Sequence, residues 1–498
     1  MIGSQRHEQP FTQVEQGPAS NSSWSIPAFL DNDSFWYLLL LFIVSGTLAI
    51  GAFGGVLFPD YAQFLVIAPV ALVLGLVMLV RPEVAMLVTV IYIPFDNWDV
   101  FALPGDLSVS KVLGLLLLGT FAFNIVLRQI RFRAFDDPQD FTIVMFAGVL
   151  LLSGVVSEFQ GTTFRQIDQM LRIIAFYLAT KNLLNSPHII LITLWGLLLA
   201  ITYASGWGIN EYYEAQAVRI HDIRVGGINM HPNAYGAIAV VGVWIGIHLF
   251  EMHRSIFVRL LIAVITVVIL YGIILSGSRG AMLALAVTGA FYIWQHPRRN
   301  ILFVTTIAAL LISFPLWPES IQVRITGEDD ALNQSVYTQT LDHSTDRRMS
   351  YQTFGLDLLA QNPLLGTGYR TFARLYPSSE FAQLDNPMKD NQRFRLAHNA
   401  YLEVATGAGF LGLTFYVLIF FFSWFALFRV KRQFKRGTLF WGAASAFELA
   451  LISLAITSLF LSIEHFQMTW FVIAMSSALA FQLRTLPPEY IEDLKTGR

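Results

Sequence analysis

Residues 397–428 read AHNAYLEVATGAGFLGLTFYVLIFFFSWFALF, and no charged side chain follows Glu403 in this stretch. An apolar run of this length is long enough to cross the hydrocarbon core of a bilayer as a helix. The segment before it, residues 318–398, is the one long polar stretch between apolar runs. Because long ordered insertions usually carry function, we expect a membrane scaffold that presents one extramembrane site.

The composition supports a membrane protein. Hydrophobic residues make up 55% of the 498 positions and charged residues 13%, whereas about a quarter of an ordinary soluble domain is charged. The formal net charge of -2 argues against nucleic acid as a partner, which would require a clustered basic surface. The chain has no cysteine, so a disulfide framework, a thiolate metal site and a cysteine nucleophile are excluded.

Apolar runs recur along the whole chain. They predict an all-α polytopic membrane protein with about 14 transmembrane helices (12–14) and one long, partly helical periplasmic loop. The third run is short and ends at Pro94, so it either crosses the membrane or re-enters the side from which it came. The runs lie near residues 36–58, 61–80, 84–94, 109–127, 140–157, 166–182, 188–206, 234–250, 257–275, 280–294, 301–317, 399–428, 438–462 and 467–484.

Charged residues orient these helices, because short cytoplasmic loops collect Lys and Arg. With fourteen crossings, four basic loops fall on one side of the membrane together with both termini. Their basic residues are Arg128, Arg131 and Arg133; Arg254 and Arg259; Arg298 and Arg299; and Arg429, Lys431, Arg432, Lys435 and Arg436. We therefore predict cytoplasmic tails at 1–35 and 485–498, helices 1–11 within 36–317, a periplasmic loop at 318–398 and helices 12–14 within 399–484.

Inside the long polar segment, the pattern predicts a helix over residues 346–361 that stops before Pro363. The sequence Asn362-Pro363-Leu364-Leu365-Gly366-Thr367-Gly368 follows it. Its proline and two glycines favour a tight turn. No Lys-Ser or Lys-Thr follows, so the segment is not a Walker phosphate loop.

Two arginines near span ends are candidates for binding an anion. Arg279 lies in the short turn Ser276-Gly277-Ser278-Arg279-Gly280, where small neighbours leave the guanidinium open and the next helix start adds backbone N–H groups. Arg224 lies shortly before His231-Pro232-Asn233, where a span begins. The alternative for Arg224 is an arginine that reaches up to lipid head groups, and for Arg279 it is a lipid phosphate ligand.

His398 is the candidate catalytic residue, since a neutral imidazole can take a proton from a hydroxyl near pH 7. A histidine at a helix start can also simply cap the helix or pack there. A metal site is disfavoured, because the nearest carboxylate, Glu403, is five positions away and off the same helical face.

Glu448 lies about ten residues into the run 438–462, which places it near the bilayer centre. An acid at that depth is costly, so it is a candidate for an intramembrane role. The alternative is an internal salt bridge, for instance to Arg172.

Together these features resemble the O-antigen ligase and polymerase superfamily, over roughly residues 224–428. The motifs that carry the resemblance are Ser276-Gly277-Ser278-Arg279-Gly280, Asn362-Pro363-Leu364-Leu365-Gly366-Thr367-Gly368, His398-Asn399-Ala400-Tyr401-Leu402-Glu403 and Gly407-Ala408-Gly409-Phe410-Leu411-Gly412. The resemblance implies transfer of a glycan from undecaprenyl diphosphate to an acceptor hydroxyl on the periplasmic face of the bacterial inner membrane. The acceptor would be a lipid or another glycan, which leaves ligase and polymerase both open.

For the site, the resemblance implies that Arg224 and Arg279 hold the diphosphate and that His398 activates or orients the acceptor. Arg347 or Arg348 would be a further loop arginine, and no metal or nucleotide cofactor is needed. The chemistry agrees: diphosphate leaves without protonation, and a single in-line displacement inverts the anomeric centre. The alternatives are a lipid-linked glycan flippase or other transporter, and a structural membrane subunit.

Overall fold

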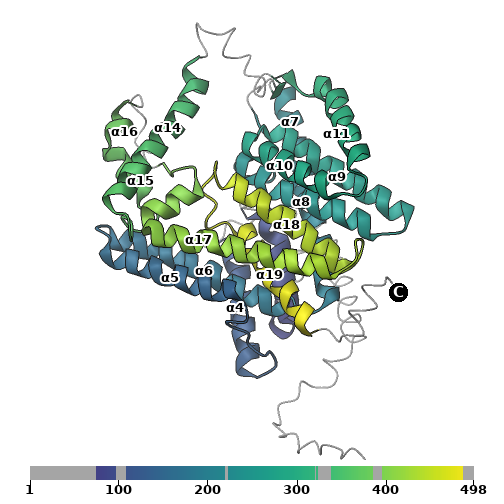
Figure 1. Cartoon of the computed structure of the whole chain (residues 1–498), viewed down its shortest axis with the longest axis horizontal. Helices are drawn as coiled ribbons and strands as arrows, with labels where there is room; N and C mark the ends of the chain where they lie inside the picture. Colours follow the sequence, from purple (N-terminus) through teal and green to yellow (C-terminus); the bar gives the residue numbers. More distant parts are fainter. Residues whose placement is uncertain are drawn as a thin grey trace, which may run out of the picture. The chain divides into compact units, whose positions relative to one another are not determined.

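The computed structural model describes residues 74–96, 108–218, 223–319, 321–322, 338–384 and 395–485, with only the backbone described for 338–347 and 383–384. These residues form helices joined by short connections, and no strand occurs among them (Figure 1). The chain divides into two compact units, Met1–Val77 and Met78–Arg498. The predicted runs at 36–58 and most of 61–80, and the two predicted tails, lie outside the described residues.

Each of the other predicted apolar runs coincides with a helix. In order, these are α3 (Pro82–Tyr92), α4 (Val109–Val126), α5 (Pro138–Val156), α6 (Gln160–Leu183), α7 (Pro187–Ala217), α8 (Pro232–Met252), α9 (Ile256–Ser276), α10 (Arg279–Gln295), α11 (Arg299–Ser313), α17 (Ala400–Gln433), α18 (Leu439–Thr457) and α19 (Gln467–Thr485). Within the described ranges, eight helices are long and apolar enough to cross a membrane. The all-helical membrane fold is therefore confirmed, and the number of about fourteen spans stays a prediction.

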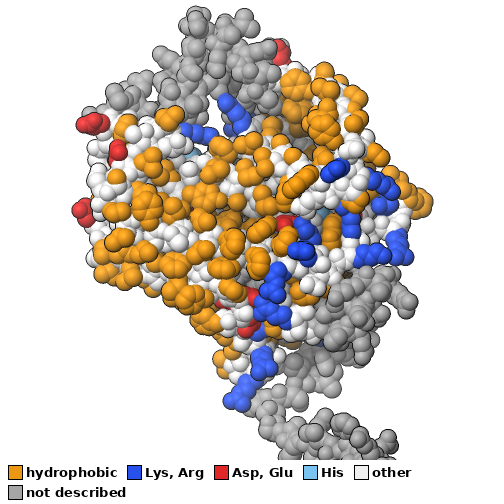
Figure 2. All heavy atoms as spheres, in the orientation of Figure 1, with side chains coloured by type: hydrophobic (Ala, Val, Ile, Leu, Met, Phe, Trp, Pro, Cys, Tyr) orange, Lys and Arg blue, Asp and Glu red, His pale blue; other side chains and the backbone are white. Residues whose placement is uncertain are grey.

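Large apolar side chains cover the outside of this unit, as expected for helices that face lipid. Figure 2 shows them spread over one broad face, with few charged groups between them. On α9, Val264 and Val267 are each more than half exposed, and α11 has no buried residue. A surface of this kind is stable in hydrocarbon and not in water.

Helix α8 forms the centre of the part that carries the candidate site. It packs against α7, α9, α10 and α18, and nearly all of its residues from Tyr235 to Leu249 are buried. Glycines on α8 permit close helix contacts, as expected for helices packing inside a membrane. A Cβ on Gly236 would lie 2.8 Å from the Ala281 side chain. The start of α10 is thereby held against the start of α8.

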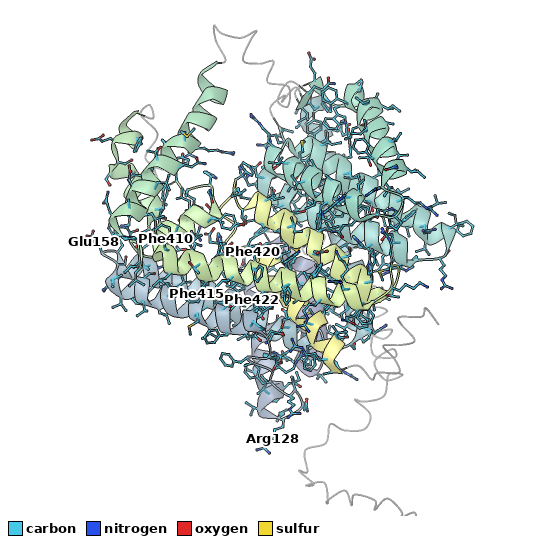
Figure 3. All side chains as sticks on the ribbon, in the orientation of Figure 1. Arg128, Glu158, Phe410, Phe415, Phe420 and Phe422 are labelled. Atoms are coloured by element: carbon cyan, nitrogen blue, oxygen red, sulfur yellow. The ribbon has the colours of Figure 1, made fainter. Side chains whose placement is uncertain are left out.

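The long polar segment docks onto a break in α17. Gly409 has φ 67° and ψ -169°, which interrupts the helix. The turn at 362–368 takes up the backbone groups freed there: Thr367 N donates to Thr406 O (2.9 Å), Gly368 N donates to Gly407 O (3.0 Å), and Phe410 N donates to Pro363 O (2.7 Å). Broken helices persist at membrane depth only where such partners exist. In Figure 3, Phe410, Phe415, Phe420 and Phe422 follow one another along α17 beyond the break.

The tight turn predicted at 362–368 is confirmed, with φ 66° at Gly366 and φ 112° at Gly368. The helix before it, α14 (Thr338–Gln361), ends where predicted but begins eight residues earlier than the predicted Asp346. Ser344 and Thr345, which read as a helix start, are interior positions. Helix α14 packs against α17, so the polar segment is anchored to the membrane helices by both its helix and its turn.

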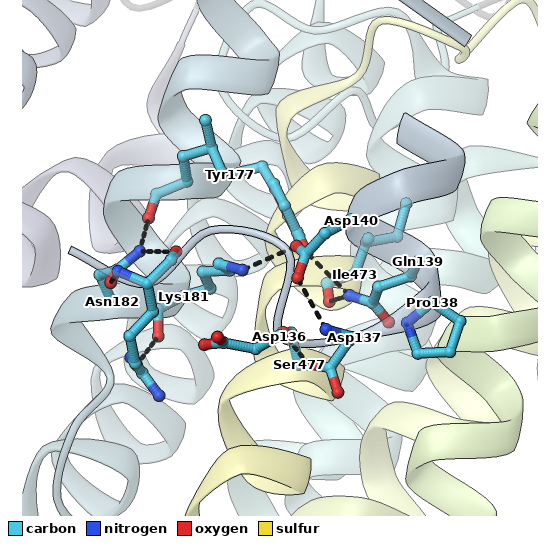
Figure 4. A network of polar contacts seen from close by, with 12 residues as sticks. Asp136, Asp137, Pro138, Gln139, Asp140, Tyr177, Lys181, Asn182, Ile473 and Ser477 are labelled. Carbon is cyan, nitrogen blue, oxygen red and sulfur yellow. Dashed lines mark hydrogen bonds and ion pairs between the residues drawn. The ribbon is translucent and has the colours of Figure 1, made fainter. Parts of the chain in front are cut away.

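A buried polar network joins the start of α5 to α6 and α19 (Figure 4). Asp140 accepts hydrogen bonds from Tyr177 Oη (2.6 Å) and Lys181 Nζ (2.7 Å). Ser477 on α19 donates to Asp137 (2.7 Å). The Lys181 and Asp140 side chains are 2% and 3% exposed, so each charge depends on the other for compensation.

Replacing Lys181 with methionine should therefore lower the free energy of unfolding by about 3–5 kcal/mol, because the Asp140 carboxylate would stay buried without its counter-ion. The apparent melting temperature in detergent measures the effect. The matched control is Arg172→Met, which breaks the Arg172–Asp168 pair, whose side chains are 56% and 58% exposed. The control should cost less than about 1 kcal/mol. Equal losses in the two variants would contradict a special role for the buried pair.

Glu448 is an ion-paired residue, and its partner is Lys431. The Glu448 side chain is 1% exposed, and Lys431 Nζ also donates to Gln295 Oε1 (3.0 Å). The predicted partner, Arg172, was wrong: it pairs with Asp168 one turn away on α6 (2.6 Å). The reason is helix order, because α18 packs beside α17, which carries Lys431, whereas α6 packs against α5 and α19.

Candidate active site

A cavity of about 350 Å³ lies where segments remote in the sequence meet. It is bounded by the starts of α8, α10 and α17, by the far end of α18 and by helix α14. Its lining residues are Arg224, His231, Asn233, Gly277, Ser278, Arg279, Gly280, Ala281, Arg348, Tyr351, Arg395, His398, Thr457, Phe460 and Leu461. Three of the residues predicted from the sequence, Arg224, Arg279 and His398, thus share one cavity, together with Arg348 of the predicted loop pair.

The lining is strongly cationic. Four arginines contribute to it, each from a different segment: Arg224, Arg279, Arg348 and Arg395. Among the described residues no Asp or Glu lines the cavity. Burial and the Arg279 charge lower the pKa of Arg348. Like charges held this close are unfavourable unless an anion joins them, so the cavity could accommodate a multiply charged anion.

Arg279 is the first residue of α10. Gly277 closes α9 with φ 54°, and Ser278 caps α10, its Oγ accepting from Ala281 N (3.4 Å). The exposed Arg279 guanidinium makes no hydrogen bond within the described part of the chain, and neither do the backbone N–H groups of Arg279 and Gly280. Unpaired N–H groups at a helix start and a free guanidinium together form an anion site.

Arg224 is held at the cavity wall by hydrogen bonds and does not extend toward lipid head groups. Its Nε donates to Ser276 O (2.7 Å) and its Nη2 donates to Asn233 Oδ1 (3.0 Å). Val225 N donates to Leu275 O (3.2 Å), which ties this loop to the end of α9. The guanidinium therefore bridges the end of α9 and the start of α8 beside the cavity.

His398 does not cap α17, so the capping interpretation was wrong. Asn399 is the cap, with its Oδ1 accepting from Tyr401 N (3.0 Å) and Leu402 N (3.1 Å). His398 itself has φ 51°, a left-handed conformation that non-glycine residues seldom adopt. Ala397 N donates to Glu403 Oε2 (2.9 Å), which stabilises this turn. The turn directs the imidazole to the cavity instead of along the helix axis.

The imidazole of His398 is half-buried and stacks on Tyr351 of α14, with ring centroids 6.0 Å apart. Burial first, and then the charges of Arg348, His231 and Arg395, lower the pKa of His398 to about 4. A histidine with this pKa is neutral at pH 7 and keeps a lone pair for a proton. His398 therefore has the protonation state that a general base requires.

Among the arginines and histidines of the lining, two were not predicted from the sequence. Arg395 precedes His398 by three positions, and His231 opens α8. Arg395 Nε is buried without a hydrogen-bond partner in the described part of the chain. Arg395 lies just before the His398 motif, and His231 lies within the segment His231-Pro232-Asn233, but nothing in a single sequence shows that the segments before α8 and α17 face each other. The Arg347 side chain lies outside the described residues, and Glu448 does not line the cavity.

Residues 262–417 match the family described as O-Antigen ligase, and no curated protein matches the chain. The matched range contains Arg279, Arg348, Arg395 and His398, while Arg224 and His231 precede it. The family implies a membrane enzyme of the glycosyltransferase type. This match covers about a third of the chain and supports its resemblance to the O-antigen ligase and polymerase superfamily.

Proposed function

We propose that this protein transfers a glycan from undecaprenyl diphosphate to an acceptor hydroxyl at the periplasmic face of the bacterial inner membrane. One observation carries the proposal: four arginines from separate segments surround a cavity that has no described carboxylate and that holds a neutral histidine. A lipid diphosphate supplies the multiple negative charges that such a cavity needs, and an acceptor hydroxyl supplies the proton that the histidine would take.

The arginines stabilise the leaving group in this scheme. As the bond from the anomeric carbon to the diphosphate breaks, negative charge grows on the diphosphate oxygens. Guanidinium groups bind such oxygens in bidentate fashion, and preorganised donors are worth most where charge develops. Arg279 is best placed, because its guanidinium and the N–H groups of Arg279 and Gly280 are all open to the cavity.

His398 acts on the acceptor. As the acceptor oxygen forms its bond to the anomeric carbon, its proton passes to the imidazole, and the diphosphate departs with the bonding electrons. A single displacement of this kind inverts the anomeric centre. A positioned base contributes about 10²- to 10⁴-fold to the rate. As the family resemblance implies, we expect no metal or nucleotide cofactor.

The orientation of the helices supports a periplasmic site. The helices that border the cavity have basic residues at their opposite ends: Arg254 between α8 and α9 and Arg259 in the first turn of α9, Arg298 after α10, and the basic residues from Arg429 to Arg436 at the end of α17 and in its connection to α18. Since basic connections are retained in the cytoplasm, the cavity lies on the outer side.

Cysteine labelling tests this topology in a chain that has no cysteine of its own. In intact spheroplasts, a membrane-impermeant maleimide should label Thr338→Cys and Asp385→Cys but not Gln433→Cys. After permeabilisation, all three should react. Labelling of position 433 alone in intact spheroplasts would reverse the topology and place the cavity on the cytoplasmic side.

Reconstitution tests the function itself. Purified protein in liposomes, supplied with a labelled lipid-linked glycan and either a lipid or a second lipid-linked glycan as acceptor, should transfer the label to one of them. The acceptor that receives it decides between ligase and polymerase. Movement of the glycan across the bilayer without transfer would instead indicate a transporter. That alternative predicts charges along a path through the membrane, whereas the described cavity gathers them at one end of the helices.

A further inference from the structure

The cavity contains a second histidine whose proton position is set by the fold. His231 caps α8: its Nδ1 accepts a hydrogen bond from Asn233 N at 3.2 Å. A ring nitrogen that accepts an N–H carries no proton itself, so the neutral imidazole must hold its proton on Nε2. His231 therefore offers the cavity a donor, Nε2–H, and has no lone pair left to act as a base.

The Nε2–H group is the hydrogen-bond donor at the start of α8, because no backbone N–H group there is open. Pro232 lacks an N–H, Asn233 N donates to His231 Nδ1, and the N–H groups of Ala234 and Tyr235 donate to His231 O (2.9 and 3.0 Å). At α10, by contrast, the N–H groups of Arg279 and Gly280 are open. Whatever hydrogen bonds α8 contributes to an anion must therefore come from side chains.

Asn233 holds the His231 side chain next to Arg224, one of the arginines of the cavity. Its backbone N–H fixes the His231 ring, and its Oδ1 accepts from Arg224 Nη2 (3.0 Å). The two cavity groups are thus set by one residue. Burial first, and then the charges of Arg224 and Arg348, lower the pKa of His231. The imidazole stays neutral near pH 7 and keeps the tautomer that the cap selects.

We propose that His231 is a substrate-binding residue that donates Nε2–H to an oxygen of the diphosphate group of the lipid-linked donor. This inference rests on the proposed function. The two histidines of the cavity then have different roles. His231, whose Nδ1 accepts the capping hydrogen bond, donates to the leaving group. His398, which makes no capping hydrogen bond, is the base that accepts the proton of the acceptor.

Two substitutions separate this role from simple capping. Asparagine at position 231 retains an oxygen near the place of Nδ1, so it keeps the cap and loses the Nε2–H donor. Glutamine places its amide N–H₂ near Nε2 and is a poorer cap. We expect His231→Asn to melt like the wild type and to bind inorganic diphosphate about tenfold or more weakly, since hydrogen bonds to charged groups are the strong ones. His231→Gln should recover most of that loss in affinity.

Isothermal titration of the detergent-solubilised full chain with inorganic diphosphate provides the measurement. His188→Asn is the matched control, because His188 is likewise next to a proline at a helix start, that of α7, but does not line the cavity. Unchanged affinity in His231→Asn, or a glutamine variant as weak as the asparagine variant, would overturn the proposal. Binding that depends on His231 in a protein without transferase activity would retain it and reject the proposed function instead.

Discussion

Arg279→Lys should reduce glycan transfer about a hundredfold or more, nearly as far as Arg279→Ala, because loss of one preorganised donor at a site of developing charge costs about 10²- to 10³-fold in rate. Lysine keeps the positive charge but loses the planar guanidinium that engages two phosphate oxygens. Arg279 has no other hydrogen-bonding task in the described structure. The rate constant for transfer from a lipid-linked glycan, at equal protein levels, is the measurement.

The matched control for this prediction is Arg299→Lys. Arg299 begins α11 beyond the opposite end of α10, is exposed, and does not line the cavity. Its replacement should leave transfer unchanged. Full activity of Arg279→Lys would show that charge alone is required there and would reduce Arg279 to a contact with lipid head groups.

Replacing His398 with asparagine should reduce transfer by about 10²- to 10⁴-fold, the contribution of a general base, while the lipid-linked donor still binds. Asparagine tolerates the left-handed backbone that His398 adopts at φ 51°. Because Asn399 caps α17, the variant should melt like the wild type. His398→Ala should be as inactive but less stable, since alanine is strained in that conformation. An active asparagine variant would exclude proton transfer to His398.

The pH dependence gives a second test of the same base. Sequence alone predicts that activity falls as the pH drops through about 6.5, the ordinary pKa of histidine. Burial and the neighbouring cations lower the pKa of His398 to about 4. Because only the neutral imidazole accepts a proton, kcat/KM for the donor, which reports the free enzyme, should stay constant from pH 8 to about pH 5 and fall below that.

Bound diphosphate changes this expectation in a defined direction. Its negative charge favours the imidazolium, so it raises the pKa of His398. At saturating donor, kcat/KM for the acceptor should therefore fall at a higher pH than kcat/KM for the donor. Identical profiles for the two substrates would contradict a base that shares its cavity with the diphosphate.

The sequence alone specifies where the helices form. A run of apolar residues forms a helix in lipid whatever surrounds it, because each backbone N–H and C=O must find its partner within the helix. For that reason the runs found in the sequence coincide with helices wherever the structure describes them. The sequence also shows which isolated polar side chains lie at span ends, where they indicate a function. Three of them, Arg224, Arg279 and His398, line one cavity.

The tertiary structure specifies which groups meet. Arg395 and His231 face His398 because the starts of α8, α10 and α17 converge, and Glu448 pairs with Lys431 because α18 lies beside α17. It also decided that Asn399 caps α17 and that the pKa of His398 is low. The physical reason is that electrostatic interactions, burial and close contact depend on distances between segments far apart in the chain, whereas the helices themselves depend on neighbours within a few residues.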